Sequence, residues 1–153
     1  SSIVIPGGEA VQATQDSDYY AWTLQTAERL RNGRVSEVDL NDVAQELEDM
    51  GKAQRHALAS QLKVLIVHLL KWRYQPSFRG VSWRLSITNA RDEIAELLED
   101  SPSLRSKIGE LVARRYPAAR SRAALETGLS DETFPQTCPF TEDQMLDAAY
   151  WPD

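Results

Sequence analysis

Four acidic residues in the first third of the chain have the types and spacing of a catalytic or metal-binding set. Asp39, Asp42, Glu46 and Asp49 follow the spacing i, i+3, i+7 and i+10, which places them on one flank of a helix. At the edge of a helix–helix seam, burial would raise the pKa of such a carboxyl group, or a cation would hold it. Together with a histidine, Glu46, Asp49 and Asp42 are candidates for metal-assisted or acid–base hydrolysis. The alternative is a solvated acidic face that pairs with basic residues elsewhere.

His68 is the histidine best placed for such chemistry. It lies on the shoulder of an apolar helical stripe, with Lys71 three residues later. A shoulder histidine can turn one ring nitrogen to a carboxylate and keep the other inside, which is how a general base or metal ligand is oriented. The alternative is a partly buried histidine that is hydrogen-bonded within the fold. No Glu-x-x-His pair of the helical di-metal type occurs, so no metal site is established and no cofactor is evident.

The spacing along the chain argues against a simple Glu46–His68 pair. If Gly51 joins two antiparallel helices, Glu46 precedes the turn by five residues and His68 follows it by seventeen. At 1.5 Å per residue the two side chains would lie about 18 Å apart along the helix axes. The pair therefore requires Gly51 to be only a kink, or a second subunit to supply one partner.

The segment "KWRYQPSFRGVSWR", residues 71–84, alternates aromatic and cationic side chains. Such a mixture can stack on single-stranded nucleic acid, or it can close a corner between helices, where arginine packs on tryptophan. Trp72 and Trp83 share the register of core leucines, which favours the corner. Arg79 lies in the expected loop and is the freest of the cations, so Arg79 and Lys71 are the candidates for binding a ligand.

A second basic segment, "RRYPAARSR" (residues 114–122), follows Arg105 and Lys107. Its arginines could contact phosphates or complement the C-terminal dipole of a helix. Binding of nucleic acid requires Arg105, Arg114, Arg120 and Arg122 to form one positive face. No helix-turn-helix signature, Gly-rich phosphate loop, zinc spacing or Ser/His/Asp order accompanies them.

The net charge of −6 over 153 residues is distributed in three blocks. Residues 1–50 carry three arginines and ten acidic residues, residues 51–122 carry fourteen basic and six acidic residues, and residues 123–153 carry seven acidic residues and no Lys or Arg. Blocks of opposite charge can pair within one fold, between subunits or with a partner. An overall acidic chain makes nucleic acid an unlikely partner without excluding it.

Several features predict a cytoplasmic protein. The longest apolar run, "VLIVHLL", is too short to span a membrane, and no basic and apolar leader opens the chain. The single cysteine, Cys138, cannot form an internal disulfide, which fits a reducing compartment.

Helical periodicity dominates from Asp16 onward, and no segment alternates like a strand. The sequence predicts an all-α, single-domain antiparallel bundle of about six to seven helices over residues 16–153, preceded by an N-terminal arm over residues 1–15. Ser1 and Ser2 of that arm resemble a cloning remnant. Helix ends are expected at Gly33, Pro76, Pro117 and Gly128, and Gly51 is expected to bend or end its helix. The expected core faces are Tyr20, Leu24, Ala27 and Leu30; Leu40, Val43, Leu47 and Met50; and Leu58, Leu62, Leu65, Leu69 and Trp72.

Seven ordered motifs between Asp18 and Trp151 resemble one known family. They are "DYYAW", "ELEDMGKAQR", "LKVLIVHLLKWRYQP", "SWRLSI", "LLEDSPSL", "ETGL…FPQTCPFT" and "MLD". In this order they are similar to the domain of unknown function 29 family. The resemblance implies a small helical protein of the bacterial cytoplasm, and it transfers no catalytic residues because the family has no assigned activity.

Taken together, the sequence favours a non-enzymatic protein-interaction module that self-associates or binds an unknown protein partner. A metal-dependent hydrolase that uses His68 with Glu46, Asp49 or Asp42 is the first alternative, which leaves open whether the protein is an enzyme. A nucleic-acid binder that uses the basic middle block is the second.

Overall fold

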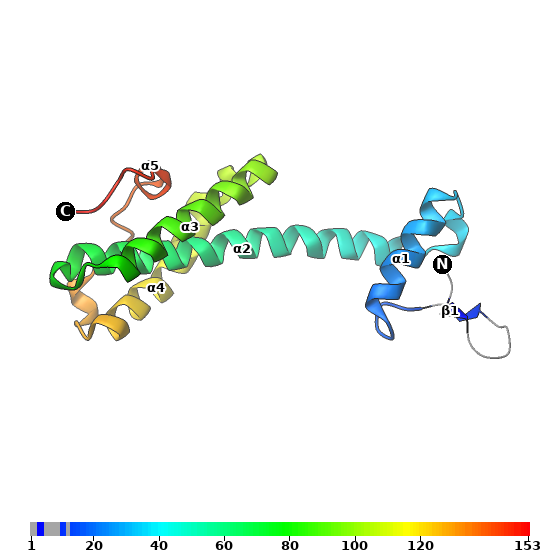
Figure 1. Cartoon of the computed structure of the whole chain (residues 1–153), viewed down its shortest axis with the longest axis horizontal. Helices are drawn as coiled ribbons and strands as arrows, with labels where there is room; N and C mark the ends of the chain where they lie inside the picture. The colour runs from blue at the N-terminus through cyan, green and yellow to red at the C-terminus, as the bar shows by residue number, and fades with distance from the viewer. Residues whose placement is uncertain (1–2, 5–9, 12) are drawn as a thin grey trace. The chain divides into compact units, whose positions relative to one another are not determined.

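The protein is built almost entirely of helices (Figure 1). The computed structural model describes residues 3–4, 10–11 and 13–153. These residues form five α-helices: α1 (Tyr19–Arg31), α2 (Leu40–Tyr74), α3 (Val81–Asp100), α4 (Ile108–Thr127) and α5 (Glu142–Leu146). Short 3₁₀ turns occupy Val35–Glu37, Pro76–Phe78, Pro102–Lys107 and Asp131–Thr133. The all-α fold class is confirmed, and the predicted count of six to seven helices is too high.

The chain divides into two compact units, residues 1–50 and residues 51–153. In the N-terminal unit, β1 (Ile3–Val4) pairs antiparallel with β2 (Ala10–Val11), a strand pair that the sequence pattern did not predict. Most of the predicted arm over residues 1–15 lies outside the described residues, as do Ser1 and Ser2. At its described end, the buried Ala13 donates its backbone N–H to Oε1 of Gln25 in α1 over 3.1 Å.

The predicted helix end at Pro117 is wrong, and of the two alternatives at Gly51, a helix end is excluded. α2 continues through Gly51, and α4 continues through Pro117. Glycine costs a helix interior about 1 kcal/mol, which the surrounding helix formers offset. Proline removes one backbone hydrogen bond, but Pro117 is on the exposed side of α4, and its neighbours Tyr116 and Ala119 are buried and hold the helix in place. The hairpin expected at Gly51 does not exist.

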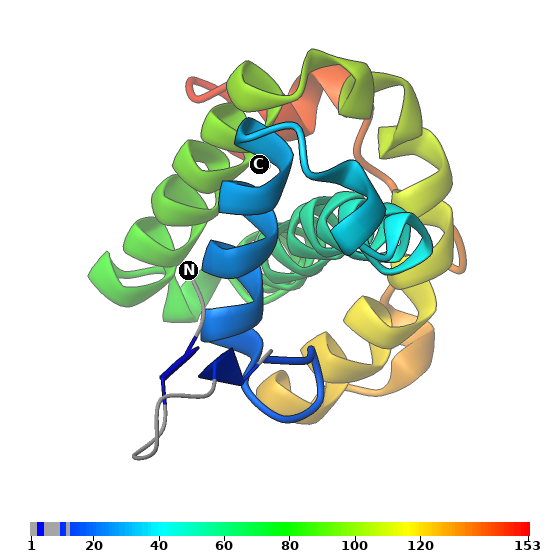
Figure 2. The ribbon, with the colours of Figure 1, turned by 90° about the vertical axis from the view of Figure 1, so that its right-hand side faces the viewer.

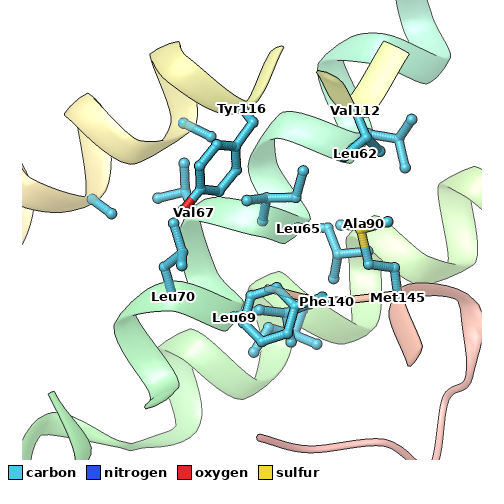
Figure 3. Close-up of a cluster of buried hydrophobic side chains, with 14 of the residues drawn as sticks. Leu62, Leu65, Val67, Leu69, Leu70, Ala90, Val112, Tyr116, Phe140 and Met145 are labelled. Carbon is cyan, nitrogen blue, oxygen red and sulfur yellow. The ribbon is translucent and has the colours of Figure 1, made fainter. Parts of the chain in front are cut away.

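The core of the C-terminal unit lies between three helices and the C-terminal tail. Figure 2, which looks along α2, shows α3 and α4 on either side of that helix. The predicted stripe of Leu58, Leu62, Leu65, Leu69 and Trp72 is buried, as expected. Figure 3 shows Leu62, Leu65 and Leu69 of this stripe in one cluster with Ala90 of α3, Val112 and Tyr116 of α4, and Phe140 and Met145 of the tail. Thr141 and Gln144 form the predicted capping box at the start of α5.

The two core faces predicted for the N-terminal unit are wrong. Tyr20, Leu24 and Leu30 of α1 are exposed, and so are Leu40, Leu47 and Met50 of α2. The residues that α1 buries are polar: Gln25, Thr26 and Arg29. Periodicity correctly places each apolar set on one helix face, but within this unit those faces are not covered.

Within the part of the chain that the structure describes, none of the helices combines the length and the apolar character needed to cross a membrane.

Candidate functional site

His68 lies on the face of α2 that is turned to α4 in the C-terminal unit. Its Nδ1 is 2.8 Å from the carbonyl oxygen of Val64, one turn earlier. Because a carbonyl oxygen only accepts, Nδ1 carries the proton and Nε2 is the bare nitrogen of the neutral ring. Burial lowers the pKa of His68, and the charge of Lys71 lowers it further, against opposing contributions from Val64 and Glu126. The ring is therefore neutral near pH 7, with one nitrogen free to accept a proton.

Lys71 and Glu126 connect α2 to α4 beside this histidine. The Lys71 ammonium is paired with the Glu126 carboxylate, and Arg122 lies 3.6 Å from the second oxygen of the same carboxylate. Burial alone would raise the pKa of Glu126, but the hydrogen bond from Lys71 and the charges of Lys71 and Arg122 outweigh it and lower that pKa. Lys71 also lies 5.5 Å from the centre of the Trp83 ring. Lys71, predicted as a ligand-binding residue, is thus a buried partner of Glu126.

A recess of about 390 Å³ opens between α2 and α4 around His68. Ser60, Lys63 and Val64 line it from α2, together with His68. Arg115, Arg122 and Glu126 line it from α4. The terminal nitrogen of Arg115 is 3.3 Å from Nδ1 of His56. The recess therefore gathers three cations around a neutral histidine, with one carboxylate that Lys71 already neutralises.

The predicted acidic flank of α2 belongs to the N-terminal unit, and its members have separate roles there. Oδ1 of Asp39 accepts the backbone N–H groups of Asn41 and Asp42, so Asp39 caps α2. Glu46 accepts hydrogen bonds from the Tyr19 hydroxyl and from Nε2 of Gln15. Asp39 thus has its partners next to it in the chain, whereas the partners of Glu46 are on α1 and in the segment before α1.

Asp49 accepts a hydrogen bond from Nε2 of Gln45 at 3.1 Å, and Asp42 is half-buried. Glu46, Asp42 and Asp49 lie in the N-terminal unit and His68 in the C-terminal unit. No three His, Cys, Asp or Glu side chains of the described residues are grouped as they would be around a metal ion. The described residues therefore provide no set of metal ligands for the metal-dependent hydrolase hypothesis.

The aromatic and cationic segment forms a packed corner, as the register of its tryptophans indicated. The ring centres of Trp72 and Trp151 are 4.8 Å apart, and the guanidinium groups of Arg84 and Arg91 lie 5.9 and 5.7 Å from the Trp151 ring. The expectation that Arg79 is free is wrong. It donates from Nε to the Trp72 carbonyl over 2.7 Å and from a terminal nitrogen to the Pro152 carbonyl over 3.3 Å, so it ties the tail to the corner.

The four arginines of the nucleic-acid hypothesis are used in different ways. Arg114 lies 3.8 Å from Glu110, and Arg122 is paired with Glu126. Arg120 donates to the Phe134 carbonyl, while Arg105 lines a separate hollow with Arg91 and Glu99. This set does not form the single positive face that the hypothesis requires.

Sequence reasoning missed an apolar groove of about 420 Å³ within the N-terminal unit. Its walls are one face of α1 and the start of α2, with the residues Tyr19, Trp22, Thr23, Thr26, Ala27, Leu30, Val43, Glu46, Leu47 and Met50. Ala27, Leu30, Val43, Leu47 and Met50 of this set were expected to be core, whereas Tyr19 and Trp22 were not assigned to a core face. The available signal was the acidic flank beside the Leu47 seam, since a helix edge rich in carboxylates is typical of a solvent-facing surface.

A comparison with protein families gives one match: the family described as Domain of unknown function DUF29, over residues 14–151. No curated protein and no solved structure matches the chain. The match runs from the segment before α1 to the tryptophan at the C-terminal corner, so it includes the groove, the His68 recess and the packed tail. The chain therefore belongs to the Domain of unknown function DUF29 family.

Proposed function

We propose that this protein is a non-enzymatic protein-interaction module, and that its N-terminal unit binds an amphipathic, cationic helix of a partner protein. The observation that carries this proposal is the apolar groove of the N-terminal unit. A groove between two helices that is lined by side chains such as Trp22, Leu30 and Leu47 suits the apolar face of a third helix.

The N-terminal unit is short of buried apolar surface. Among residues 13–50, Ala13 is the only hydrophobic residue that is fully buried, whereas Leu30, Leu47 and Met50, which line the groove, are 38%, 63% and 57% exposed. Burying one leucine side chain stabilises a protein by about 2 kcal/mol, so this exposed face represents a large unused contribution. Contiguous apolar patches of this kind usually mark interaction sites.

Charge specifies the kind of helix that fits. Residues 1–50 carry ten acidic residues against three arginines, and Glu46 lines the groove itself. Asp42 and Asp49 are on α2 one turn before and one turn after Glu46. A carboxylate that lines an apolar groove, with two more one turn away on the same helix, attracts a partner with lysine or arginine beside its apolar face and disfavours an acidic partner.

The test uses synthetic peptides in place of the unidentified partner. One peptide is an amphipathic helix of leucine and lysine, the second has glutamate in place of lysine, and the third is a scrambled version of the first with the same composition. Binding is followed from the indole signal of Trp22 in two-dimensional NMR. We expect the lysine peptide to bind at least about tenfold more tightly than either of the others.

Leu47→Gln should remove this binding, whereas Leu125→Gln should leave it unchanged. Leu125 is a matched control because it is 78% exposed and lies on α4 in the other unit. Equal binding of the three peptides, or equal effects of the two substitutions, would contradict the proposal. A native mass twice that of the chain, which Leu47→Gln reduces to the mass of a single chain, would also contradict the proposal. The groove would then be occupied by a second copy of this protein.

We also propose that the protein works in a reducing, bacterial cytoplasm. Support comes from Cys138, a free thiol that is half-buried. Its Sγ lies 3.6 Å from the carbonyl oxygen of Phe140. Burial raises the pKa of this thiol, so it stays protonated and unreactive. Thiol titration of protein from its native cells should find one free thiol per chain, and a mixed or intermolecular disulfide would contradict the proposal.

A further inference from the structure

We propose that the recess around His68, between α2 and α4, binds a phosphate group through Lys63, Arg115 and Arg122. This site is separate from the groove of the N-terminal unit and does not depend on the function proposed for that groove. The recess has a volume of about 390 Å³, which accommodates a phosphate group together with part of the molecule that carries it.

The first support is an excess of positive charge. Lys63, Arg115 and Arg122 face a single carboxylate, that of Glu126. Glu126 is already paired with Lys71, whose side chain is only 9% exposed. Among the described residues, Lys63 has no ion pair, and the contact of Arg115 is with a ring nitrogen of His56. Two cations therefore line the recess without an acidic partner.

The second support is the supply of hydrogen-bond donors from two helices. Arg115 and Arg122 bring guanidinium groups from α4, while Lys63 and the hydroxyl of Ser60 come from α2. A tetrahedral dianion has oxygens on all sides and can accept from both walls, whereas a planar carboxylate uses one edge and leaves charge uncompensated. The arrangement thus favours a phosphate over a carboxylate ligand.

The third support is His68 itself. With Nδ1 bonded to Val64, its Nε2 is bare in the neutral ring and becomes a donor when it is protonated. The groups that face it are Lys63 and Lys71 from α2 and Arg115, Arg122 and Glu126 from α4. An anion among these groups favours the protonated ring, so binding of phosphate and uptake of one proton are coupled.

Among the described residues, no Phe, Tyr or Trp side chain lines the recess, which separates this site from a binding site for single-stranded nucleic acid. The recess is lined by Val64 and Val67 where such a site would have stacking rings. The phosphate can belong to a small molecule or to a lipid headgroup, and both sources offer the same group to the same side chains.

The experiment titrates the intact protein with inorganic phosphate at constant ionic strength, with chloride as the control anion. The chain has only two histidines, His56 and His68, so the imidazole signals in NMR are readily assigned with a His68→Gln variant. We expect a saturable change at His68 and a rise in its pKa in the presence of phosphate. Vesicles of phosphatidylcholine, with and without a phosphatidylinositol phosphate, form a second arm.

Lys63→Met should weaken phosphate binding about tenfold, while Lys107→Met, which removes an exposed lysine outside the recess, should not. Both lysines are at least partly exposed, so both variants should fold, and thermal unfolding verifies this. Saturable binding in either arm supports the site, and the stronger arm identifies the source of the phosphate. A response equal to that of chloride, or equal losses in the two lysine variants, would overturn the proposal.

Discussion

Lys71 of α2 and Glu126 of α4 are joined by an ion pair in which the lysine side chain is 9% exposed and the glutamate side chain 35% exposed. The lysine would be costly to bury alone, because an unpaired ammonium loses its hydration without compensation. Glu126 thus allows α2 to keep a buried cation one turn after Val67 and His68.

The Lys71–Glu126 ion pair predicts how three variants rank in their free energy of unfolding. Glu126→Gln should lower the free energy of unfolding by about 2 kcal/mol, less than for a fully buried pair because the carboxylate is partly in water. Lys71→Met should cost less, since the methionine fills the same space without a charge. Adding Lys71→Met to Glu126→Gln should recover part of the loss. Urea unfolding measures all three, and an effect of Glu126→Gln below about 0.5 kcal/mol would show that the pair contributes little.

The stability of the protein should fall as the pH decreases through the range in which histidine titrates. Burial lowers the pKa of His68 below its ordinary value of 6.5, so below that pH the unfolded chain binds a proton that the folded protein resists. The loss begins as the pH falls through 6.5 and ends below the folded pKa. Urea unfolding at several pH values should show a smaller decrease for His68→Gln. Identical curves for the two proteins would contradict this assignment.

The C-terminal corner should depend on Trp151. Its ring packs on Trp72 and lies under Arg84 and Arg91, while Arg79 holds the Pro152 carbonyl. Trp151→Ala should cost about 2 kcal/mol, less than for a fully buried tryptophan because the ring is partly exposed. Trp151→Phe keeps an aromatic face and should cost less than half of that. Chemical denaturation measures both, and equal costs would show that the ring stacking does not matter.

Two glycines with equally open surroundings should respond in opposite directions to alanine. A Cβ atom would meet no other atom within 4 Å at either Gly51 or Gly128. Gly51 is inside α2, so Gly51→Ala should stabilise the helix by up to about 1 kcal/mol. Gly128 ends α4 with a φ of +75°, so Gly128→Ala should destabilise it by about 1 kcal/mol. Thermal unfolding compares them, and a gain for both would contradict the role of φ.

Local patterns were sufficient for the elements that a short stretch of chain determines. The stripe from Leu58 to Trp72 is buried as the periodicity predicted, and the Thr141–Gln144 capping box is present. The continuity of α2 and α4 was not predictable in this way. At Gly51 the helix formers on both sides offset a cost of about 1 kcal/mol, although the neighbouring side chains are exposed. At Pro117 the cost is about 3 kcal/mol, and it is offset by the packing of Tyr116 and Ala119 in the core, which depends on residues far away in the sequence.

The candidate sites likewise include features that local sequence patterns predict and features that only tertiary contacts decide. His68 was identified from its shoulder position, but its neighbours Arg115, Arg122 and Glu126 come from α4, about 50 to 60 residues later, a pairing of helices that periodicity does not reveal. Arg79 was expected to be free because it lies in a loop, yet the Pro152 carbonyl at the far end of the chain engages it.

By itself the sequence determined the all-α class, the family, the core stripe of α2 and the acidic and basic charge blocks, because each follows from residue type and near-neighbour spacing. Only the tertiary structure decided which apolar faces are covered. Leu47 and Leu62 each belong to an apolar stripe with helical spacing along α2. Leu62 is buried in the core with residues of α3 and α4, while Leu47 lines an open groove. A hydrophobic face indicates which side chains a helix can bury, and the positions of the other helices determine which of these side chains are buried.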